Sequence, residues 1–286
     1  MTLANNNHMQ LWIGTCGYSY PDWVGDFYPR GTSAQGMFTH YVRQFPIVEL
    51  NYTFYRPAEK TSLLRLAERA PEGFQFIVKL HRSLSHEHNL SEVPGIRSAV
   101  DALQQENKLL GLLCQYPQEF HYTSDNRERL QTVADQFPGH TLAVEFRHRS
   151  WDVPEVTDWL RERQLHLVSV DVPDIPNLYP TGLVQSSRLI YIRLHSRNKK
   201  SWYGADDKRR YDYLYSDKEL LEWIDMLVHS ADKADRALML FNNCYGTQAA
   251  RNAQRVQQLL AQMTTSLEVV PPPQGSEQEG EQRLLF

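Results

Sequence analysis

This chain of 286 residues has little cysteine and no long hydrophobic run. Its three cysteines, Cys16, Cys114 and Cys244, are too few and too widely spaced for a disulfide scaffold or a zinc knuckle. No apolar stretch approaches the roughly 18 residues that a membrane-spanning helix needs. The first ten residues have neither the basic nor the apolar part of a secretory signal. We therefore expect a protein of the reducing cytoplasm, without a membrane partner.

The chain also lacks a large excess of charge of either sign. The formal net charge of −4 argues against a chain that coats nucleic acid through overall basicity, although it allows a local basic patch. No glycine-rich phosphate fingerprint follows the first expected strand, and no internal repeat is visible. Hydrophobic residues make up 41% of the chain, which is enough for a sizeable core. The length suits one large α/β domain or two small ones.

Short apolar segments alternate with amphipathic segments along most of the chain. The eight apolar segments, which we expect to be strands, are residues 11–16, 47–51, 74–79, 110–115, 142–147, 166–171, 189–195 and 237–243. The expected helices are residues 61–69, 96–107, 126–136, 156–163, 217–229 and 248–263. This alternation over roughly 250 residues predicts a (β/α)8 TIM barrel, with a doubly wound open sheet as the alternative.

We expect the barrel to be a single domain that spans residues 11–263. Residues 1–10 are polar and are expected to be disordered. Residues 172–187 contain three prolines and no clear period, which predicts a loop over one barrel face. Residues 264–286 carry three consecutive prolines and a run rich in Gln, Glu and Gly, which is typical of a flexible tail.

Charged side chains occur where the expected strands end. Residues 142–147 read Leu-Ala-Val-Glu-Phe-Arg, so strand alternation puts Glu145 and Arg147 on the face opposite Leu142 and Val144. Unpaired charges would be expensive to bury, so we expect them to pair at the rim of a site. In a barrel, inward-pointing groups at the carboxyl ends of strands converge at one mouth, where barrel enzymes place their chemistry.

The residues expected at this mouth fall into three chemical classes. The candidate acids, bases and proton-positioning groups are Glu49, Glu145, Asp171 and His195. The candidate cations for holding phosphate are Lys79, Arg147 and Arg193. The candidate amides for orienting a substrate are Asn51, Gln115, Asn242 and Asn243. This set suits acid–base catalysis on a substrate with phosphate or carboxylate. Each charge could instead form a structural pair, such as Glu145 with Arg147 or Glu49 with Lys79.

The order of several motifs resembles the YecE-like family, a domain of unknown function. The matching segments are Gly-Thr-Cys-Gly-Tyr-Ser-Tyr-Pro-Asp-Trp at 14–23 with Phe-Tyr-Pro at 27–29, Val-Glu-Leu-Asn at 48–51 with Thr-Phe-Tyr at 53–55, Val-Lys at 78–79 with His-Arg at 81–82, Gln-Tyr-Pro at 115–117, Ala-Val-Glu-Phe-Arg-His at 143–148 with Ser-Trp at 150–151, Tyr-Ile-Arg-Leu-His at 191–195, and Phe-Asn-Asn at 241–243 with Gly246 and Arg-Asn-Ala at 251–253. The resemblance covers about residues 11–263. It implies a (β/α)8 barrel and no established reaction.

The segment from residue 193 to residue 215 combines basic and aromatic side chains. Its loop cations are Arg197, Lys199, Lys200, Lys208, Arg209 and Arg210, and its aromatic residues are Trp202, Tyr203, Tyr211, Tyr213 and Tyr215. Such interleaving suits a phosphate backbone with stacked bases. The alternative is a solvated loop in which Asp206, Asp207 and Asp212 offset the charge. The aromatic candidates for substrate contact are Trp151, Trp202, Tyr203 and Tyr213.

We expect no cofactor and no bound metal. His81, His86 and His88, with Glu87, lack the spacing of a helical zinc motif. A divalent cation held by Glu49, Glu145 and Asp171 is an alternative at the mouth. The neighbouring lysine and arginines already supply positive charge there, which makes a metal ion unnecessary.

The final five residues read Gln-Arg-Leu-Leu-Phe and resemble the short peptide by which bacterial proteins dock on the replication sliding clamp. That peptide has Gln first and a Leu-Phe pair last, often on a flexible tail. The expected clamp contacts are Gln282, Leu285 and Phe286. The alternative is an apolar end that folds back on the barrel.

These features favour a barrel enzyme, a hydrolase or lyase, that acts on a phosphate-bearing substrate. Nucleic acid is the favoured substrate class, because the basic aromatic segment and the terminal peptide both point to it. One alternative is a metal-free enzyme that acts on a small phosphorylated or acidic sugar, with Glu49 and Glu145 as its acid–base pair. Another is a non-catalytic binding protein that uses the mouth as a recognition pocket.

Overall fold

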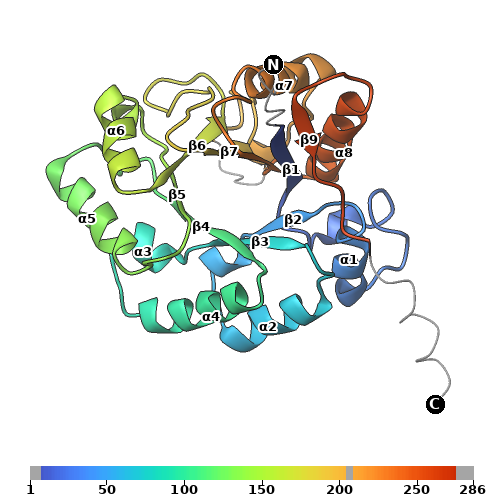
Figure 1. Cartoon of the computed structure of the whole chain (residues 1–286), viewed down its shortest axis with the longest axis horizontal. Helices are drawn as coiled ribbons and strands as arrows, with labels where there is room; N and C mark the ends of the chain where they lie inside the picture. Colours follow the sequence, from blue (N-terminus) through green and yellow to red (C-terminus); the bar gives the residue numbers. More distant parts are fainter. Residues whose placement is uncertain (1–7, 204–208, 275–286) are drawn as a thin grey trace, which may run out of the picture.

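Eight parallel strands close into a barrel in the computed structural model, which describes residues 8–203 and 209–274 (Figure 1). The strands are β1 (Met9–Cys16), β2 (Ile47–Leu50), β3 (Gln75–Lys79), β4 (Leu109–Gln115), β5 (Leu142–Glu145), β6 (His166–Asp171), β7 (Leu189–Leu194) and β8 (Arg236–Phe241). Each strand pairs with the next along the chain, and β8 pairs with β1. The predicted barrel is thus confirmed, because an open sheet would leave β1 and β8 apart.

Helices surround the strands on the outside of the barrel (Figure 1). They are α1 (Ala34–Tyr41), α2 (Lys60–Arg69), α3 (Arg82–Ser85), α4 (Val93–Gln105), α5 (Ser124–Ala134), α6 (Pro154–Glu162), α7 (Asp217–Val228) and α8 (Gln248–Leu260). The sequence pattern predicted all of these except α1 and α3, which are too short to show a clear period. Within the described ranges, no helix is both long and apolar enough to cross a membrane.

Local sequence signals account for several helix starts. Ser216 precedes α7 in a capping box, in which its hydroxyl accepts from the backbone of Glu219 and the glutamate side chain accepts in return. The hydroxyl of Thr123 accepts from Asn126 N at the start of α5. Pro154 occupies the first turn of α6, where its missing N–H costs nothing. These caps fix where each helix begins relative to the strand before it.

A ninth strand, β9 (Leu267–Val269), extends the sheet beside β1. It pairs with residues 9–11 of β1, whereas β2 pairs with residues 14–16, so β9 covers a strand edge that β2 leaves open. The prediction of a flexible tail from residue 264 is therefore wrong for this part. The predicted disorder up to residue 10 is also wrong at its end, because residues 9 and 10 belong to β1. Residues 1–7 and 275–286 lie outside the described residues.

Strand register decides which side chains face the barrel interior. Residues that pair across parallel strands point to the same side of the sheet, so Glu49 beside Cys16 and Glu145 beside Gln115 form inward-facing pairs. On β6, Asp171 pairs with Leu194, the neighbour of the inward-facing arginine of β7. Because successive residues alternate between faces, Asp171 is turned to the outside of the barrel.

The connection from β6 to β7 has no helix and packs against the carboxyl end of β5. The backbone N–H of Tyr179 donates to Arg147 O at 2.8 Å, and His148 forms an isolated bridge with Leu178. These contacts confirm the prediction of a loop at one face of the barrel. They also fix the backbone of Arg147, which lies just beyond the end of β5.

At Gly14, β1 passes close to the backbone of β2. A Cβ atom there would lie 2.3 Å from the backbone oxygen of Ile47. We expect Gly14→Ala to force the strands apart and to lower the free energy of unfolding by about 1–3 kcal/mol, measured by urea denaturation. Gly95→Ala in α4, where nothing lies within 4 Å of the added carbon, is the control and should be neutral or stabilising. Equal stability of Gly14→Ala and the wild type would contradict this close approach.

Candidate active site at the barrel mouth

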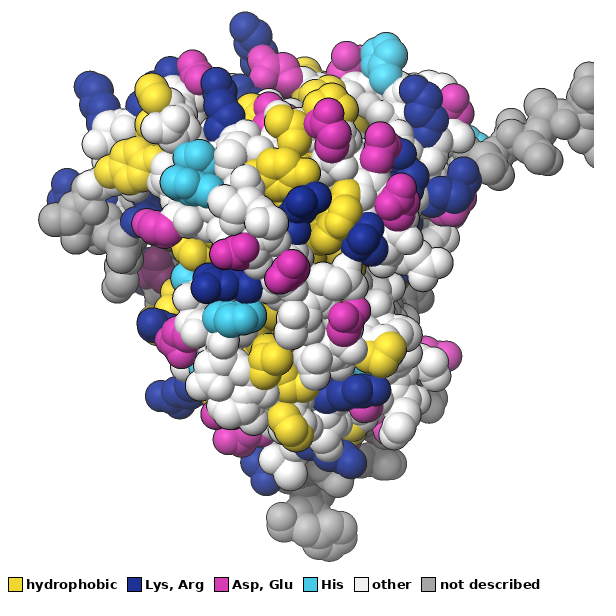
Figure 2. Space-filling view, turned by 90° about the vertical axis from the view of Figure 1, so that its left-hand side faces the viewer, with side chains coloured by type: hydrophobic (Ala, Val, Ile, Leu, Met, Phe, Trp, Pro, Cys, Tyr) yellow, Lys and Arg dark blue, Asp and Glu magenta, His cyan; other side chains and the backbone are white. Residues whose placement is uncertain are grey.

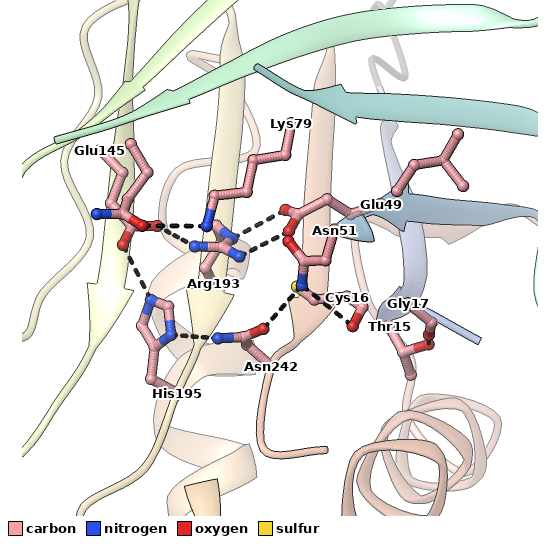
Figure 3. A network of polar contacts seen from close by, with 12 residues as sticks. Thr15, Cys16, Gly17, Glu49, Asn51, Lys79, Glu145, Arg193, His195 and Asn242 are labelled. Atoms are coloured by element: carbon pink, nitrogen blue, oxygen red, sulfur yellow. Dashed lines mark hydrogen bonds and ion pairs between the residues drawn. The ribbon is translucent and has the colours of Figure 1, made fainter. Parts of the chain in front are cut away.

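Arg193 of β7 lies between two carboxylates inside the barrel (Figure 3). Its Nε and Nη2 atoms donate to Oε2 and Oε1 of Glu49 at 2.9 and 2.6 Å. Its Nη1 atom donates to Oε2 of Glu145. Glu49 and Glu145 are fully buried, and Arg193 is 1% exposed. These three side chains, here termed the buried ion cluster, join β2, β5 and β7 across the interior.

Glu49 is fully occupied by partners within the protein. The hydroxyl of Tyr191 donates to its Oε2, so both carboxylate oxygens accept hydrogen bonds from buried donors. Arg193 is occupied in the same way by the two glutamates. The predicted roles of Glu49 as a catalytic base and of Arg193 as a phosphate ligand do not fit this geometry. The two residues are better explained as a support beneath the site.

Glu145 connects the buried ion cluster to the groups above it. Its Oε1 lies 2.8 Å from Arg147 Nε and 3.3 Å from His195 Nε2. Burial alone would raise the pKa of Glu145, but the guanidinium groups of Arg147 and Arg193 hold that pKa well below its usual range. The carboxylate therefore stays ionised. The pairing of Glu145 with Arg147 that the sequence offered as an alternative is present.

A chain of hydrogen bonds orients His195. Asn51 Nδ2 donates to Asn242 Oδ1 at 3.2 Å, which leaves Asn242 Nδ2 to donate to His195 Nδ1 at 2.8 Å (Figure 3). The proton of the neutral imidazole must then lie on Nε2, facing Glu145. Burial, with the nearby charge of Arg147, lowers the pKa of His195 to about 3. His195 is therefore neutral at physiological pH, despite its ionised neighbour.

Lys79 extends from the end of β3 toward the same groups (Figure 3). Its Nζ donates to Gln115 Oε1 at 3.0 Å and lies 4.3 Å from the ring centroid of Phe54. In the part of the chain that the structure describes, no carboxylate oxygen lies within ion-pair distance of Nζ, so the suggested pairing with Glu49 is absent. Burial, followed by the positive charge of Arg193, lowers the pKa of Lys79 to about 8.

A cavity of about 800 Å³ opens at the carboxyl ends of the strands above these groups. Its polar lining includes four predicted site residues, Asn51, Lys79, Arg147 and Asn242. Its remaining walls come from loops after β1, β2, β7 and β8 and include Tyr20, Asp22, Tyr55, Tyr211, Cys244 and Tyr245. The volume is typical of a small-molecule site. A hollow of similar size lies at the opposite end of the barrel, where barrel enzymes do not place their chemistry.

Arg147 presents free donors to this cavity. Its Nε faces Glu145, while its two Nη atoms have no hydrogen-bond partner among the described residues. The guanidinium lies 5.9 Å from the ring centroid of Trp202, and the arginine side chain is 12% exposed. Trp202 is itself only 3% exposed, so it supports Arg147 from behind rather than offering a stacking surface.

Asp171 does not belong to the mouth, contrary to prediction. On the outside of the barrel it accepts hydrogen bonds from Arg197 Nε and Nη2 at 3.0 and 2.8 Å and from Trp223 Nε1 at 2.5 Å. The sequence placed Asp171 at a strand end but did not show on which face of the sheet its side chain lies. A cation shared by Asp171, Glu49 and Glu145 is therefore not supported, because the three carboxylates do not converge.

Asn243 and Trp151 also lie away from the cavity. Asn243 lies two residues beyond the end of β8, and strand alternation turns its side chain to the outside of the barrel. Its Nδ2 donates to the backbone oxygen of Tyr213 at 2.8 Å. Trp151 is 1% exposed, stacks on Phe146 with ring centroids 4.1 Å apart, and donates from Nε1 to Phe120 O at 2.6 Å. Both predicted substrate contacts are thus structural, because neighbouring loops cover them.

In its described part, the basic aromatic segment has side chains that pair with acidic groups of the same chain. The hydroxyl of Tyr213 donates to Glu219, and Lys199 lies 3.5 Å from Asp174. Tyr203 alone of the predicted stacking residues is well exposed, at 59%, and it donates to a glutamine. Lys208 lies outside the described residues. Figure 2 shows basic and acidic side chains interspersed over one side of the molecule, without an extended basic patch on that side.

The histidines after β3 have local structural roles. The ring of His81 accepts from Ser83 N at the start of α3, and His86 Nδ1 lies 2.7 Å from Ser85 Oγ. Within residues 8–203 and 209–274, no three His, Cys, Asp or Glu side chains are grouped to hold a metal ion. The predicted clamp contacts Gln282, Leu285 and Phe286 lie outside the described residues, so clamp docking stays a prediction.

Four tyrosines at the mouth or beneath it, Tyr20, Tyr55, Tyr191 and Tyr245, are not among the predicted site residues. Tyr191 is two residues before Arg193 on β7, so strand alternation would have placed it on the same inward face. Tyr20, Tyr55 and Tyr245 each follow a strand end within a few residues and line the cavity. Their signal was their position in loops that follow the carboxyl ends of strands, where barrel proteins place their binding residues.

The buried ion cluster predicts a strong dependence on Arg193. Arg193→Met would leave Glu49 and Glu145 buried without their shared cation, and we expect a loss of about 3–5 kcal/mol in the free energy of unfolding. Adding Glu49→Gln to the same chain should recover part of this loss, because one unpaired carboxylate is then removed. Urea denaturation of both variants tests this. If the double variant proves less stable than Arg193→Met alone, the pairing is not the cause.

The neutral state of His195 predicts a specific pH dependence. Its pKa is about 3 in the folded protein against an ordinary value of 6.5, so the unfolded chain binds this proton first. The contribution to stability is complete above pH 6.5 and is lost as the pH falls toward 3. Between pH 6.5 and 4.5 the wild type should lose about 2 kcal/mol more stability than His195→Gln, measured by urea denaturation. Parallel pH profiles would show that folding does not lower the pKa of His195.

Comparisons with known proteins place this architecture in a family. A family model described as "Protein of unknown function DUF72" matches residues 12–277. The UPF0759 protein YunF of Bacillus subtilis is 30% identical over 271 residues, which cover 87% of this chain and 94% of that protein. The YecE-like resemblance of the sequence motifs refers to the same family and is confirmed.

Solved structures of the family share the barrel. A DUF72 family protein from Thermotoga maritima, TM1631, superposes with a TM-score of 0.82 and 33% identity, covering 89% of this chain and all of that one. Another, EF0366 from Enterococcus faecalis, has a TM-score of 0.79 and 25% identity, covering 89% of this chain and 96% of that one. From the family match over most of its length and the shared fold, this chain belongs to the DUF72 family.

Proposed function

We propose that this protein is an enzyme, a hydrolase or lyase, that acts on a small phosphate-bearing substrate in the mouth cavity. The observation that carries the proposal is a pair of cations on the cavity lining, Lys79 Nζ and the Nη atoms of Arg147. Neither set of donors is taken by a carboxylate of the described residues, although Arg147 Nε is. Charge-assisted hydrogen bonds from such donors are the usual means of holding phosphate.

The charge balance beneath the cavity supports an anionic ligand. The two buried carboxylates of the ion cluster are matched by Arg193 and Arg147. Protonated Lys79 then adds one positive charge that has no acidic partner at ion-pair distance in the described chain. A phosphate group would supply the missing negative charge in a largely desolvated place, where such interactions are stronger than in water.

The same site holds groups suited to proton transfer. Lys79 has a pKa of about 8 and can act as a base near neutral pH. The amides of Asn51 and Asn242 line the cavity and can orient hydroxyl or carbonyl groups of a substrate. Neutral His195 lies behind Asn242 and holds its amide in place, so we assign it a positioning role.

A nucleic-acid substrate is the second candidate. Tyr55 and Tyr245 line the cavity and are 72% and 45% exposed, so their rings could stack on the bases of a strand that passes over the mouth. The substrate would then insert one nucleotide into the cavity. The small phosphate ester is favoured because Arg197, Lys199 and Tyr213 of the basic aromatic segment already pair with acidic side chains of this chain.

Thermal unfolding with added ligands tests this function. Ribose 5-phosphate, inorganic phosphate and a single-stranded oligonucleotide would each be added to the wild type, Arg147→Gln and Arg149→Gln. Arg149 is an exposed neighbour outside the mouth cavity and serves as the matched control. We expect a small phosphate to raise the Tm of the wild type and of Arg149→Gln. Arg147→Gln should bind it at least about tenfold more weakly.

Each outcome of the ligand test has a clear meaning. Stabilisation by the oligonucleotide alone, lost in Arg147→Gln, would favour the second candidate over the first. Stabilisation that is identical in Arg147→Gln and the wild type would place the ligand elsewhere and contradict both. No stabilisation by any of the three ligands would contradict a phosphate-bearing substrate.

A further inference from the structure

Lys79 has the surroundings of a nucleophilic amine rather than those of a structural ion pair. Its described hydrogen-bond acceptor is the neutral amide of Gln115, and the ring of Phe54 covers one side at 4.3 Å. Arg193 and Arg147 are the neighbouring cations, and the residue is 9% exposed at the cavity. Desolvation and neighbouring positive charge are two means by which proteins keep a lysine amine neutral and reactive.

We propose that Lys79 forms an imine with the carbonyl carbon of an open-chain sugar phosphate whose phosphate group is held by Arg147. This proposal rests on the proposed function, because Arg147 is the same phosphate ligand, while Lys79 supplies its positive charge as the protonated imine. The substrate is then an aldehyde or ketone that also carries a phosphate group. The carbonyl compound could be a free sugar phosphate or the ring-opened sugar of an abasic site in a nucleic acid, since both present the same chemistry.

The chemical step balances without a metal or a redox partner. The Nζ lone pair attacks the carbonyl carbon, and the carbonyl oxygen takes a proton to give a carbinolamine. That hydroxyl leaves as water after a further proton transfer, so amine, carbonyl and one proton give a protonated imine and one water molecule. The positive nitrogen then accepts electrons when a bond to the neighbouring carbon breaks, which is the chemistry that a lyase requires.

The site is arranged to support this step. Asn51 and Asn242 line the cavity with Lys79 and provide amide groups for the carbonyl oxygen or the departing water. Glu49 and Glu145 lie behind Lys79 without contacting it at ion-pair distance, and their charges stabilise the positive imine that replaces the ammonium group. The pKa of about 8 leaves a useful fraction of the amine neutral at physiological pH.

Reductive trapping tests the proposal on the full chain. The wild type would be incubated at pH 8 with sodium cyanoborohydride and, in separate arms, glyceraldehyde 3-phosphate, 2-deoxyribose 5-phosphate or an oligonucleotide with one abasic site. Peptide mass mapping then locates the adduct. We expect labelling of Lys79 at least tenfold above any other lysine, with a rate that is half-maximal near pH 8.

Two variants serve as controls for the trapping. Lys79→Arg keeps the charge but should lose the adduct. Lys108→Arg should label as the wild type does, because Lys108 donates to Ala70 O and Pro71 O, at the end of the barrel opposite the mouth. The wild-type peptide map stands by itself if Lys79→Arg fails to fold.

The outcomes separate this inference from the proposed function. Preferential labelling of Lys79 by a free sugar phosphate or by the abasic oligonucleotide supports the imine, and the more reactive arm identifies the source. Labelling of Lys79 no greater than that of exposed lysines overturns it. If phosphate still stabilises the wild type but not Arg147→Gln, the proposed function survives that result. Absence of both labelling and phosphate binding overturns both.

Discussion

The site depends on one buried interaction, the guanidinium group of Arg193 held between Glu49 and Glu145. Carrying three charges into a barrel interior is expensive, and only near-complete pairing makes it tolerable. Arg193 meets this condition because its flat group donates to both carboxylates, while Tyr191 occupies another lone pair of Glu49. The cluster therefore holds β2, β5 and β7 in a defined relation and fills the barrel directly beneath the mouth.

This arrangement decides which neighbouring groups can act on a ligand. The carboxylates that resemble an acid–base pair in the sequence are occupied in the structure, and the positive field of Arg193 and Arg147 acts on the groups above them. Burial, together with the positive charge of the arginines, lowers the pKa of Lys79 to about 8 and that of His195 to about 3, against the opposing charge of the glutamates. Burial beside these two arginines thus gives Lys79 and His195 their chemical character.

Much of the site could be predicted because strand alternation and the barrel rule act together. Nine of the predicted residues do gather at the mouth or directly beneath it, namely Glu49, Asn51, Lys79, Gln115, Glu145, Arg147, Arg193, His195 and Asn242. Their roles could not be predicted, because a role depends on which partner takes each donor. The direction of a side chain at a strand end could not be predicted either. Asp171 and Asn243 both lie at strand ends, but their side chains face the outside of the barrel.

The sequence by itself determined the succession of strands and helices, the barrel class and the family, because hydrophobic period and ordered motifs are local properties. Only the tertiary structure decided that Arg193 is sealed between two glutamates, that Trp151 belongs to the core and that residues 267–269 join the sheet. Those facts depend on register, on which loops cover which strand ends and on contacts between residues as far apart as 49 and 193. Such contacts exist only once the barrel has closed.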